Sequence, residues 1–164
     1  MPDILHSEST RLIARYGMQE HPEGGWYVER FRSEQTVQPD DHRAQRSALT
    51  TILFLLDGAQ DGGISALHKV RSDEVWHHLD GDPIELVVLQ EDFSSLDRAP
   101  LDRDHPVYVV PANHWQSART TGHYTLVGCT VGPGFDFEDF TLLRSDAITE
   151  EAFIAHHPSL AHLL

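Results

Sequence analysis

The sequence predicts an all-β protein with a short helix at each end of the chain, and three observations support that class. Seven short runs are rich in β-branched and aromatic residues. Glycine and proline mark the turns between them, as at Gly62-Gly63 and Gly132-Pro-Gly134. The length of 164 residues fits one domain, residues 1–164. Short strands joined by such turns favour a closed or nearly closed antiparallel sandwich, of which the double-sheet jelly roll is one form.

Each element has its own local signal. Apolar residues recur at helical intervals over 3–16, and Gly17 is a typical helix stop. Polar segments 36–46 and 91–104 are predicted to be exposed loops. Thr149-Glu-Glu151 before Phe153 resembles a capped helix start, and Pro158 ends or interrupts that helix. The predicted strands are 26–33, 48–56, 64–70, 75–79, 84–90, 107–110 and 124–131.

Charge and cysteine content narrow the partners and the compartment. Twenty-six acidic and twelve basic residues give a net charge of −14, which repels phosphate backbones and anionic membrane surfaces. We therefore expect no nucleic-acid or membrane partner. The single cysteine, Cys129, rules out an internal disulfide framework and fits a reducing compartment. The N-terminal MPDILHSEST lacks the basic and apolar regions of a secretory signal, so we expect a cytoplasmic protein.

Strand periodicity brings one histidine and one carboxylate together. Side chains two positions apart face the same side of a strand, so Glu74, Trp76 and His78 share one face of the strand after His68. A tight turn over 71–73 would place His68 near Glu74. Imidazole and carboxylate suit iron, manganese, zinc or nickel if further donors converge on the same point.

Five blocks of the sequence together resemble the Cupin-5 family, a branch of the cupin superfamily. They cover nearly the whole chain, and their joint occurrence is more specific than any single motif. The resemblance implies a cupin jelly-roll β-barrel, a pocket in the barrel mouth and a homodimer, with no settled activity. The blocks are HPEGGWYVERFRS (21–33), ALTTILFLL (48–56), SALHKVRSDEVWHHLDGDPIELVVL (65–89), VVPANHWQSA (109–118) and LVGCTVGPGFDFEDFTLL (126–143).

The metal motif of cupins is only half present. Its spacing, G-x5-H-x-H-x3-E-x6-G, places His68 and Glu74 at ligand positions but puts Val70 where a second histidine belongs. Gln116 stands where the other half of the motif has its histidine, and His78 is the best nearby substitute by strand parity. A divalent iron, manganese, nickel or zinc ion would therefore depend on His68, Glu74, His78 and Gln116.

The same residues also suit chemistry without a metal. A histidine beside a carboxylate can act as a general base, because the carboxylate orients one ring nitrogen and makes the other more basic. Some cupins that epimerise or isomerise sugars resemble this arrangement and use a histidine base with a tyrosine acid. Here His68 would be the base, Glu74 its partner, and Tyr27 or Tyr108 the acid.

Five side chains are predicted to contact a ligand. Trp76 offers an aromatic face on which sugar rings or bases stack, as does Trp115, although tryptophan also serves as core packing. Trp26 shares a half-buried strand face with Arg30. Arg30 has the planar fork that matches a carboxylate or phosphate. His78 and Gln116 supply polar contacts from neighbouring strands.

Three functions remain open from the sequence. We favour a small-molecule-binding cupin for a polar, sugar-like or nucleotide-like ligand, with metal-independent epimerase or isomerase chemistry based on His68. The second is a metal-dependent isomerase or dioxygenase. The third is a non-catalytic storage-like or scaffold dimer, in which the barrel itself is the function.

Overall fold

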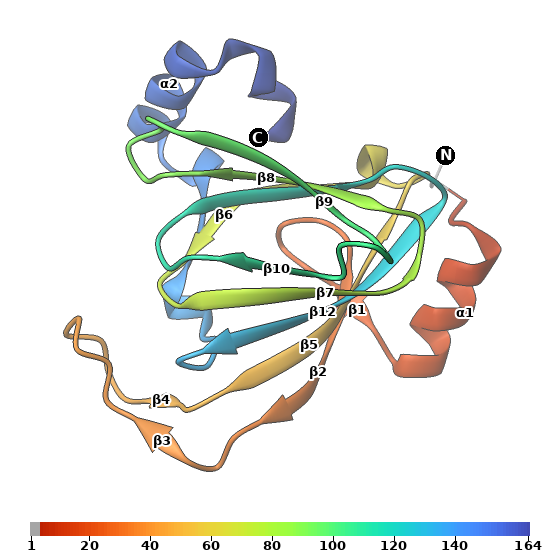
Figure 1. Ribbon diagram of the computed structural model, residues 1–164, viewed down its shortest axis with the longest axis horizontal. Helices are drawn as coiled ribbons and strands as arrows, with labels where there is room; N and C mark the ends of the chain where they lie inside the picture. The colour runs from red at the N-terminus through yellow and green to blue at the C-terminus, as the bar shows by residue number, and fades with distance from the viewer. Residues whose placement is uncertain (1–3) are drawn as a thin grey trace.

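The computed structural model describes residues 4–164 and confirms the all-β prediction. Two antiparallel sheets face each other, with one helix near each end of the chain (Figure 1). The six-stranded sheet has the order β1-β2-β5-β12-β7-β10. Its strands are β1 (Gln19–Glu20), β2 (Trp26–Arg32), β5 (Thr50–Asp57), β12 (Tyr124–Gly132), β7 (Asp73–Gly81) and β10 (Val107–Val110).

The second sheet has five strands in the order β13-β6-β11-β8-β9. They are β13 (Phe140–Leu142), β6 (Ile64–Val70), β11 (Trp115–Thr120), β8 (Ile84–Leu89) and β9 (Leu96–Leu101). The helices are α1 (Ser7–Tyr16) and α2 (Ala147–His156), and the 3-10 turns are η1 (Asp61–Gly63), η2 (Phe137–Asp139), η3 (Leu143–Ser145) and η4 (Pro158–Leu163).

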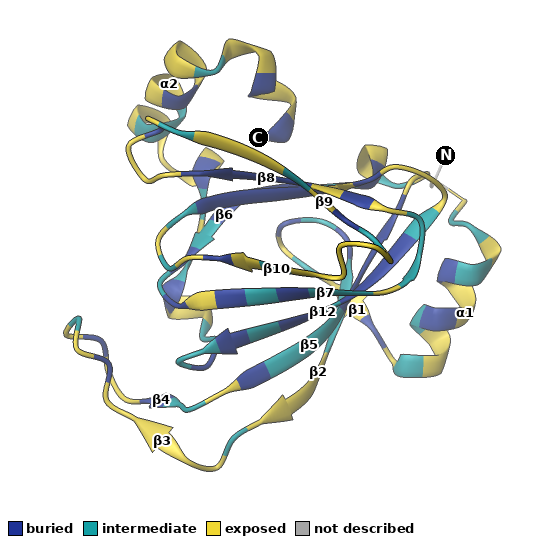
Figure 2. Ribbon diagram, in the orientation of Figure 1, coloured by how far each residue is buried: buried dark blue, intermediate teal, exposed yellow. Residues whose placement is uncertain are grey.

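Strand β8 shows how the sheets pack, because it is buried on both faces (Figure 2). Leu86 and Val88 point into the core between the two sheets, together with Trp76 and Phe54. Val87, on the opposite face of β8, packs with the apolar side chains of α2 and η4. A strand with both faces covered appears in the sequence as a continuous apolar run rather than an alternating one.

Helix α1 covers part of the outer face of the six-stranded sheet, where Leu12 packs with Leu55 and Leu126. Gly17 ends the helix in the left-handed conformation, at φ 65°, as its position in the sequence predicted. The predicted start at residue 3 lies outside the described residues, and the helix begins at Ser7. Asp146 caps α2 by accepting a hydrogen bond from the Thr149 backbone N–H at 3.2 Å.

The prediction of a loop over 91–104 was wrong, because this segment contains β9. Strand β9 lies at the edge of its sheet and is mostly exposed, so it lacks the apolar alternation that marks a strand. It also contains Pro100, which edge strands tolerate. Strands β11 and β13 were also missing from the prediction.

The predicted loop 36–46 is part of an arm, residues 33–48, that is tied to the barrel. The arm carries a small sheet of β3 (Thr36–Val37) and β4 (Arg46–Ser47). Buried Asp139 accepts hydrogen bonds from Arg43 Nη1, Arg46 Nε and Arg46 Nη2, each at 3.0 Å. Burial disfavours the Asp139 carboxylate, but its hydrogen bonds to the two arginines lower its pKa below the usual range.

Over residues 4–164, none of the helices combines the length and the apolar character needed to cross a membrane.

Candidate functional site

The site begins with a tight turn, residues 21–25, that joins β1 to β2 and reaches across to the other sheet. The turn is closed by hydrogen bonds from the His21 backbone N–H to Gly25 O and from the Gly24 N–H to His21 O, both at 2.9 Å. Gly24 and Gly25 have φ of 99° and 75°, and a Cβ at Gly25 would lie 2.7 Å from Leu55 O. Only glycine fits this conformation and this close approach.

The turn places Glu23 beside strand β6. The Ala66 N–H donates to Glu23 O at 2.7 Å, and Ala66 O accepts from His68 Nδ1 at 2.8 Å. One residue of β6 therefore holds both the turn and the imidazole ring. The Glu23 carboxyl Oε2 lies 3.0 Å from His68 Nε2 and 3.4 Å from His21 Nδ1.

The Glu23 and His68 side chains share one proton. Because Ala66 O can only accept, Nδ1 of His68 carries a hydrogen and Nε2 faces Glu23. Burial raises the pKa of Glu23 well above its usual range, and nearby Glu74 raises it further. Burial lowers the pKa of His68 to about 4, although the hydrogen bond to Ala66 opposes this shift. The pair is therefore a protonated carboxyl group donating to a neutral imidazole.

His21 is the third member of this cluster. Its Nδ1 accepts the backbone N–H of Glu23 at 3.3 Å. Burial, with a smaller contribution from His68, lowers the pKa of His21 to about 3, so the ring is neutral. His21 therefore supports the turn. The Glu23 carboxyl group donates its hydrogen bond to His68, because that contact is shorter than the one to His21.

A small cavity of about 30 Å³ lies between the sheets, behind Glu23, and both Glu23 and His68 line it. On its wall, Glu74 Oε2 accepts from Gln116 Nε2 at 2.6 Å, and Gln116 Oε1 accepts from Trp76 Nε1 at 2.9 Å. Burial raises the pKa of Glu74 to about 7, opposed by hydrogen bonds from Gln116 and the Cys129 thiol. The volume suits water-sized occupants and excludes a sugar.

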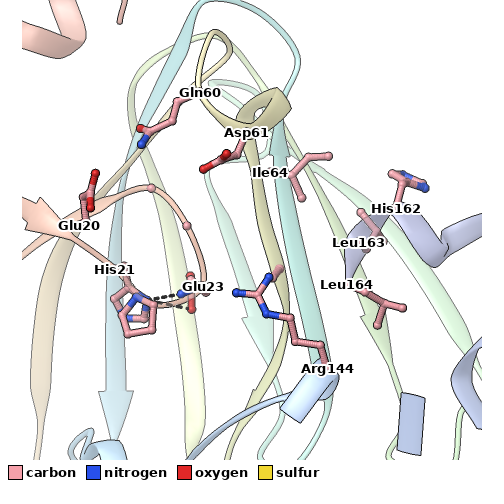
Figure 3. A pocket seen from close by; sticks show the side chains of 14 residues that line it. Glu20, His21, Glu23, Gln60, Asp61, Ile64, Arg144, His162, Leu163 and Leu164 are labelled. Carbon is pink, nitrogen blue, oxygen red and sulfur yellow. Dashed lines mark hydrogen bonds and ion pairs between the residues drawn. The ribbon is translucent and has the colours of Figure 1, made fainter. Parts of the chain in front are cut away.

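A much larger cleft of about 550 Å³ opens on the other side of Glu23 (Figure 3). Ligand pockets for small molecules commonly have volumes of roughly 300–1,000 Å³. The cleft is bounded by the 21–25 turn, by η1 and the start of β6, and by η3 and η4. Glu23 and His21 line both the cleft and the cavity. Residues of the acid–base cluster thus line both a small cavity and a space of ligand size.

The structure brings together four of the predicted site residues, three from strand parity and Gln116 from the cupin motif. His68, Glu74 and Trp76 line the cavity, and Gln116 connects Glu74 to Trp76. Tyr27 also lines the cavity, and its hydroxyl accepts from the Gln19 side chain at 2.9 Å.

The remaining predicted residues lie elsewhere. Trp26 packs in the cluster of α1 and supports the cleft indirectly, because its indole N–H donates to Gln60 Oε1 at 2.7 Å. Arg30 is exposed where the β2–β5 register shifts, and it lines neither the cleft nor the cavity. Tyr108 packs against the core between the sheets. His78 is half-buried beside Asp82, with its Nε2 3.3 Å from Asp82 O.

The four predicted metal ligands do not form one donor set. His78 shares a strand face with Glu74, but four residues of strand place it about 13 Å further along, beyond buried Trp76. The Gln116 amide is already bonded to Glu74 and Trp76. Across residues 4–164, no group of three or more His, Cys, Asp or Glu side chains has an arrangement that could hold a metal ion. The residues present therefore do not fit the four-ligand metal site.

Sequence reasoning missed Glu23 and His21 as functional residues. The signal was the string HPEGG, in which an acid and a histidine precede two glycines at the start of a strand. Strand parity links residues of adjacent strands, but it does not reveal that a turn 45 residues earlier in the chain packs against His68.

Comparison with known families supports the same architecture. Residues 10–143 match the family model Cupin_5, described as Cupin superfamily (DUF985). None of the curated protein sequences matches the chain.

Three solved structures illustrate the likeness. A hypothetical protein from Leishmania major is 28% identical with a TM-score of 0.78, and the match covers 94% of this chain and 95% of that one. A protein from Shewanella oneidensis is 27% identical with a TM-score of 0.77, covering 96% and 94%. A cupin 2 domain-containing protein from Halorhodospira halophila is 20% identical with a TM-score of 0.55, covering 89% and 86%, which supports the fold alone.

Proposed function

The chain belongs to the Cupin_5 family, and on that premise we propose that it binds a small polar molecule in the cleft and exchanges a proton with it through Glu23 and His68. The observation that carries this proposal is the position of Glu23. Its carboxyl group lines the 550 Å³ cleft and lies 3.0 Å from the buried His68 ring. A ligand in the cleft would therefore meet the carboxyl group, with the imidazole directly behind it.

Proton movement in this arrangement balances. When a bound ligand gives a proton to Glu23, the proton already on Glu23 passes to His68 Nε2, and Ala66 O stabilises the resulting imidazolium through Nδ1–H. The reverse transfer returns a proton to the ligand from the same carboxyl group. If that proton returns to a neighbouring carbon of the ligand, the two transfers complete an isomerisation. An epimerisation would need the proton to return to the same carbon from its opposite face, and a single carboxyl group serves only one face. His68 thus keeps the role of ultimate base, and Glu23 relays the proton.

Two other functions have less support from the geometry. The metal-dependent alternative requires His68, Glu74, His78 and Gln116 to meet, and these side chains are spread between the cavity and the far end of β7. A storage-like or scaffold role gives no reason for a buried acid–base pair beside a cleft, because burying such groups lowers stability. For the location we propose the cytoplasm, since the one cysteine is buried and unpaired with another.

Glu23→Gln tests the proposal. The amide can still donate to His68 Nε2, so the fold is preserved, but it cannot release a proton. Sugars, sugar acids and nucleotides are first screened for compounds that raise the Tm of the wild type. We expect the wild type to react with these compounds and Glu23→Gln to bind them without reaction. The readout is proton NMR in D2O, in which the wild type replaces a ligand C–H by deuterium and Glu23→Gln does not. Glu151→Gln, exposed on α2, is the matched control.

Two results would contradict the proposal. If no compound in a broad metabolite panel raised the Tm of the wild type, the cleft would not be a binding site. If Glu23→Gln exchanged deuterium as fast as the wild type, the proton would take another route. If a ligand bound but exchanged no deuterium, the protein would be a binding protein, and the proposed proton transfer would be wrong.

A further inference from the structure

One cation is available in the cleft. Arg144 is exposed on η3, and its guanidinium extends into the cleft (Figure 3). Among the lining side chains within residues 4–164 it is the only arginine or lysine. In the same described part of the chain it forms no hydrogen bond or ion pair, whereas Arg43 and Arg46 each bond to Asp139 and to further partners.

The position of Arg144 is fixed by its neighbours. Leu142 pairs with His68 in the ladder between β13 and β6. Arg144 is two residues after Leu142 and therefore starts close to the acid–base pair. Leu143 is fully buried in the cluster of α2 and η4, and Ser145 Oγ donates to Leu142 O at 2.6 Å. The backbone on both sides of Arg144 is therefore anchored, while the guanidinium donors remain unpaired.

The acid–base pair does not supply a counter-charge for Arg144. Glu23, the buried acid among the lining residues of the cleft, is protonated and donates a hydrogen bond to His68, so it does not neutralise Arg144. Glu20 and Asp61 enter from β1 and η1, and both are exposed. The cleft thus offers one free cation, one proton-exchanging group and two acceptors for hydroxyl groups.

From these groups we propose that the ligand is a small polyhydroxy carboxylate, a sugar acid, whose carboxylate binds Arg144 while its hydroxyl groups bind Glu20 and Asp61. This inference rests on the proposed function, because it assigns a ligand class to the same cleft. A guanidinium matches a carboxylate with two parallel N–H···O bonds. A phosphate dianion carries twice the charge, and one cation between two carboxylates does not compensate it. The carboxylate therefore points to η3, and the hydroxyl-bearing carbons lie toward Glu23.

Isothermal titration calorimetry tests this assignment. The probes are gluconate and glucuronate as sugar acids, glucose as the neutral counterpart, and glucose 6-phosphate as the dianion. We expect at least one sugar acid to bind the wild type more tightly than glucose or glucose 6-phosphate. Arg144→Gln should weaken sugar-acid binding by about 10 to 100-fold, as expected for loss of charge-assisted hydrogen bonds. Glucose binding should not change.

Matched variants separate charge from fold. Arg144→Lys keeps the charge but loses the planar fork, so its affinity should lie between those of the wild type and Arg144→Gln. Arg103→Gln, an exposed arginine beside β10, should bind like the wild type. Because Arg144 is exposed, all three variants should keep the Tm of the wild type.

The contrary outcomes are distinct from failure of the proposed function. Equal affinity for glucose and the sugar acids, or unchanged binding by Arg144→Gln, would overturn the ligand class and leave the Glu23 proposal standing. Tighter binding of glucose 6-phosphate would also overturn it. If none of the four probes binds the wild type with a Kd below about 10 mM, the sugar-acid assignment is wrong. The Glu23→Gln exchange experiment then decides the proposed function by itself.

Discussion

Two buried carboxyl groups share the space between the sheets, and burial favours the neutral form of both. Glu23 donates a hydrogen bond to His68, whereas Glu74 accepts hydrogen bonds from Gln116 and the Cys129 thiol, which favour its ionised form. Burial is the main reason that both pKa values are raised, and Glu74 adds to the shift of Glu23. Ionising one carboxyl group therefore makes ionising the other harder, as for other carboxyl groups that share a site.

Glu74→Gln should remove the pH dependence that the ionisation of Glu74 gives to the free energy of unfolding. The protonated form of Glu74 is favoured in the folded state, with a pKa of about 7 against 4.5 when exposed. Its stabilising contribution is complete below pH 4.5 and is lost as the pH rises to about 7. The amide imitates the protonated carboxyl group at every pH. Relative to the wild type, the free energy of unfolding of Glu74→Gln should therefore rise by about 3 kcal/mol across this interval.

Urea denaturation of both proteins from pH 4.5 to 8 measures this difference. Subtracting the two curves removes the opposite contributions of His21 and His68, whose lowered pKa values make stability rise with pH over the same range. Glu151→Gln, exposed on α2, should give a flat difference. A flat difference for Glu74→Gln as well would show that Glu74 is ionised throughout.

At the scale of elements, the arm of residues 33–48 depends on one acidic side chain. Asp139, in η2, is 2% exposed and is the shared acceptor of Arg43 and Arg46. Asp139→Asn would remove the buried anion that the two guanidinium groups share, leaving Arg43 with Asp41 and Arg46 with Glu138, both more exposed than Asp139. Removing one partner of a buried ion pair typically costs about 3–5 kcal/mol. We expect this loss in urea denaturation, together with faster proteolysis within the arm.

The neighbouring acid provides a matched control for the arm. The side chain of Glu138 is 78% exposed and lies 3.4 Å from Arg46 Nη2. Exposed ion pairs contribute about 0–1 kcal/mol, so Glu138→Gln should be nearly neutral. Equal effects of the two substitutions would mean that the arm is not held by Asp139.

The elements also show how far the sequence can predict the structure. Apolar runs located the central strands, and parity correctly brought His68 and Glu74 to one cavity. Parity gives the face of a side chain but not its distance along the strand, which is why His78 lies away from the site. The role of Glu23 depends on a contact with His68 on the other sheet, and such a contact leaves no pattern in the local sequence. Strand β9 is an exposed edge, so its sequence lacks the apolar alternation that identifies a strand.

For the whole molecule, we propose that a second copy covers the outer face of β7 and β10. Strand β10 is the edge of the six-stranded sheet and is largely exposed (Figure 2). Leu79 and Val109 are each 51% exposed, and Val107 is 52% exposed. An unpaired apolar edge is normally covered in natural proteins, and a two-fold dimer would cover it.

Val109→Lys should therefore weaken the dimer, because two lysines would meet near the two-fold axis. Light scattering at micromolar concentration should give a dimer for the wild type and a monomer for the variant. Ile148→Lys, on α2 and 79% exposed, should remain dimeric. A monomeric wild type, or a Val109→Lys variant that stays dimeric, would contradict the proposal.

The placement of Glu23 gives the inner chamber an unusual kind of boundary. The same carboxyl group lines the cleft and the 30 Å³ cavity, so a hydrogen ion taken up on the cleft side can be handed on to the cavity side without the passage of a larger molecule. A cavity of this volume holds water-sized species and no bulky reagent. Cys129 lines it, is 1% exposed and is hydrogen-bonded to Glu74, so its thiol should react slowly with an alkylating agent although its neighbours still respond to the acidity of the solvent.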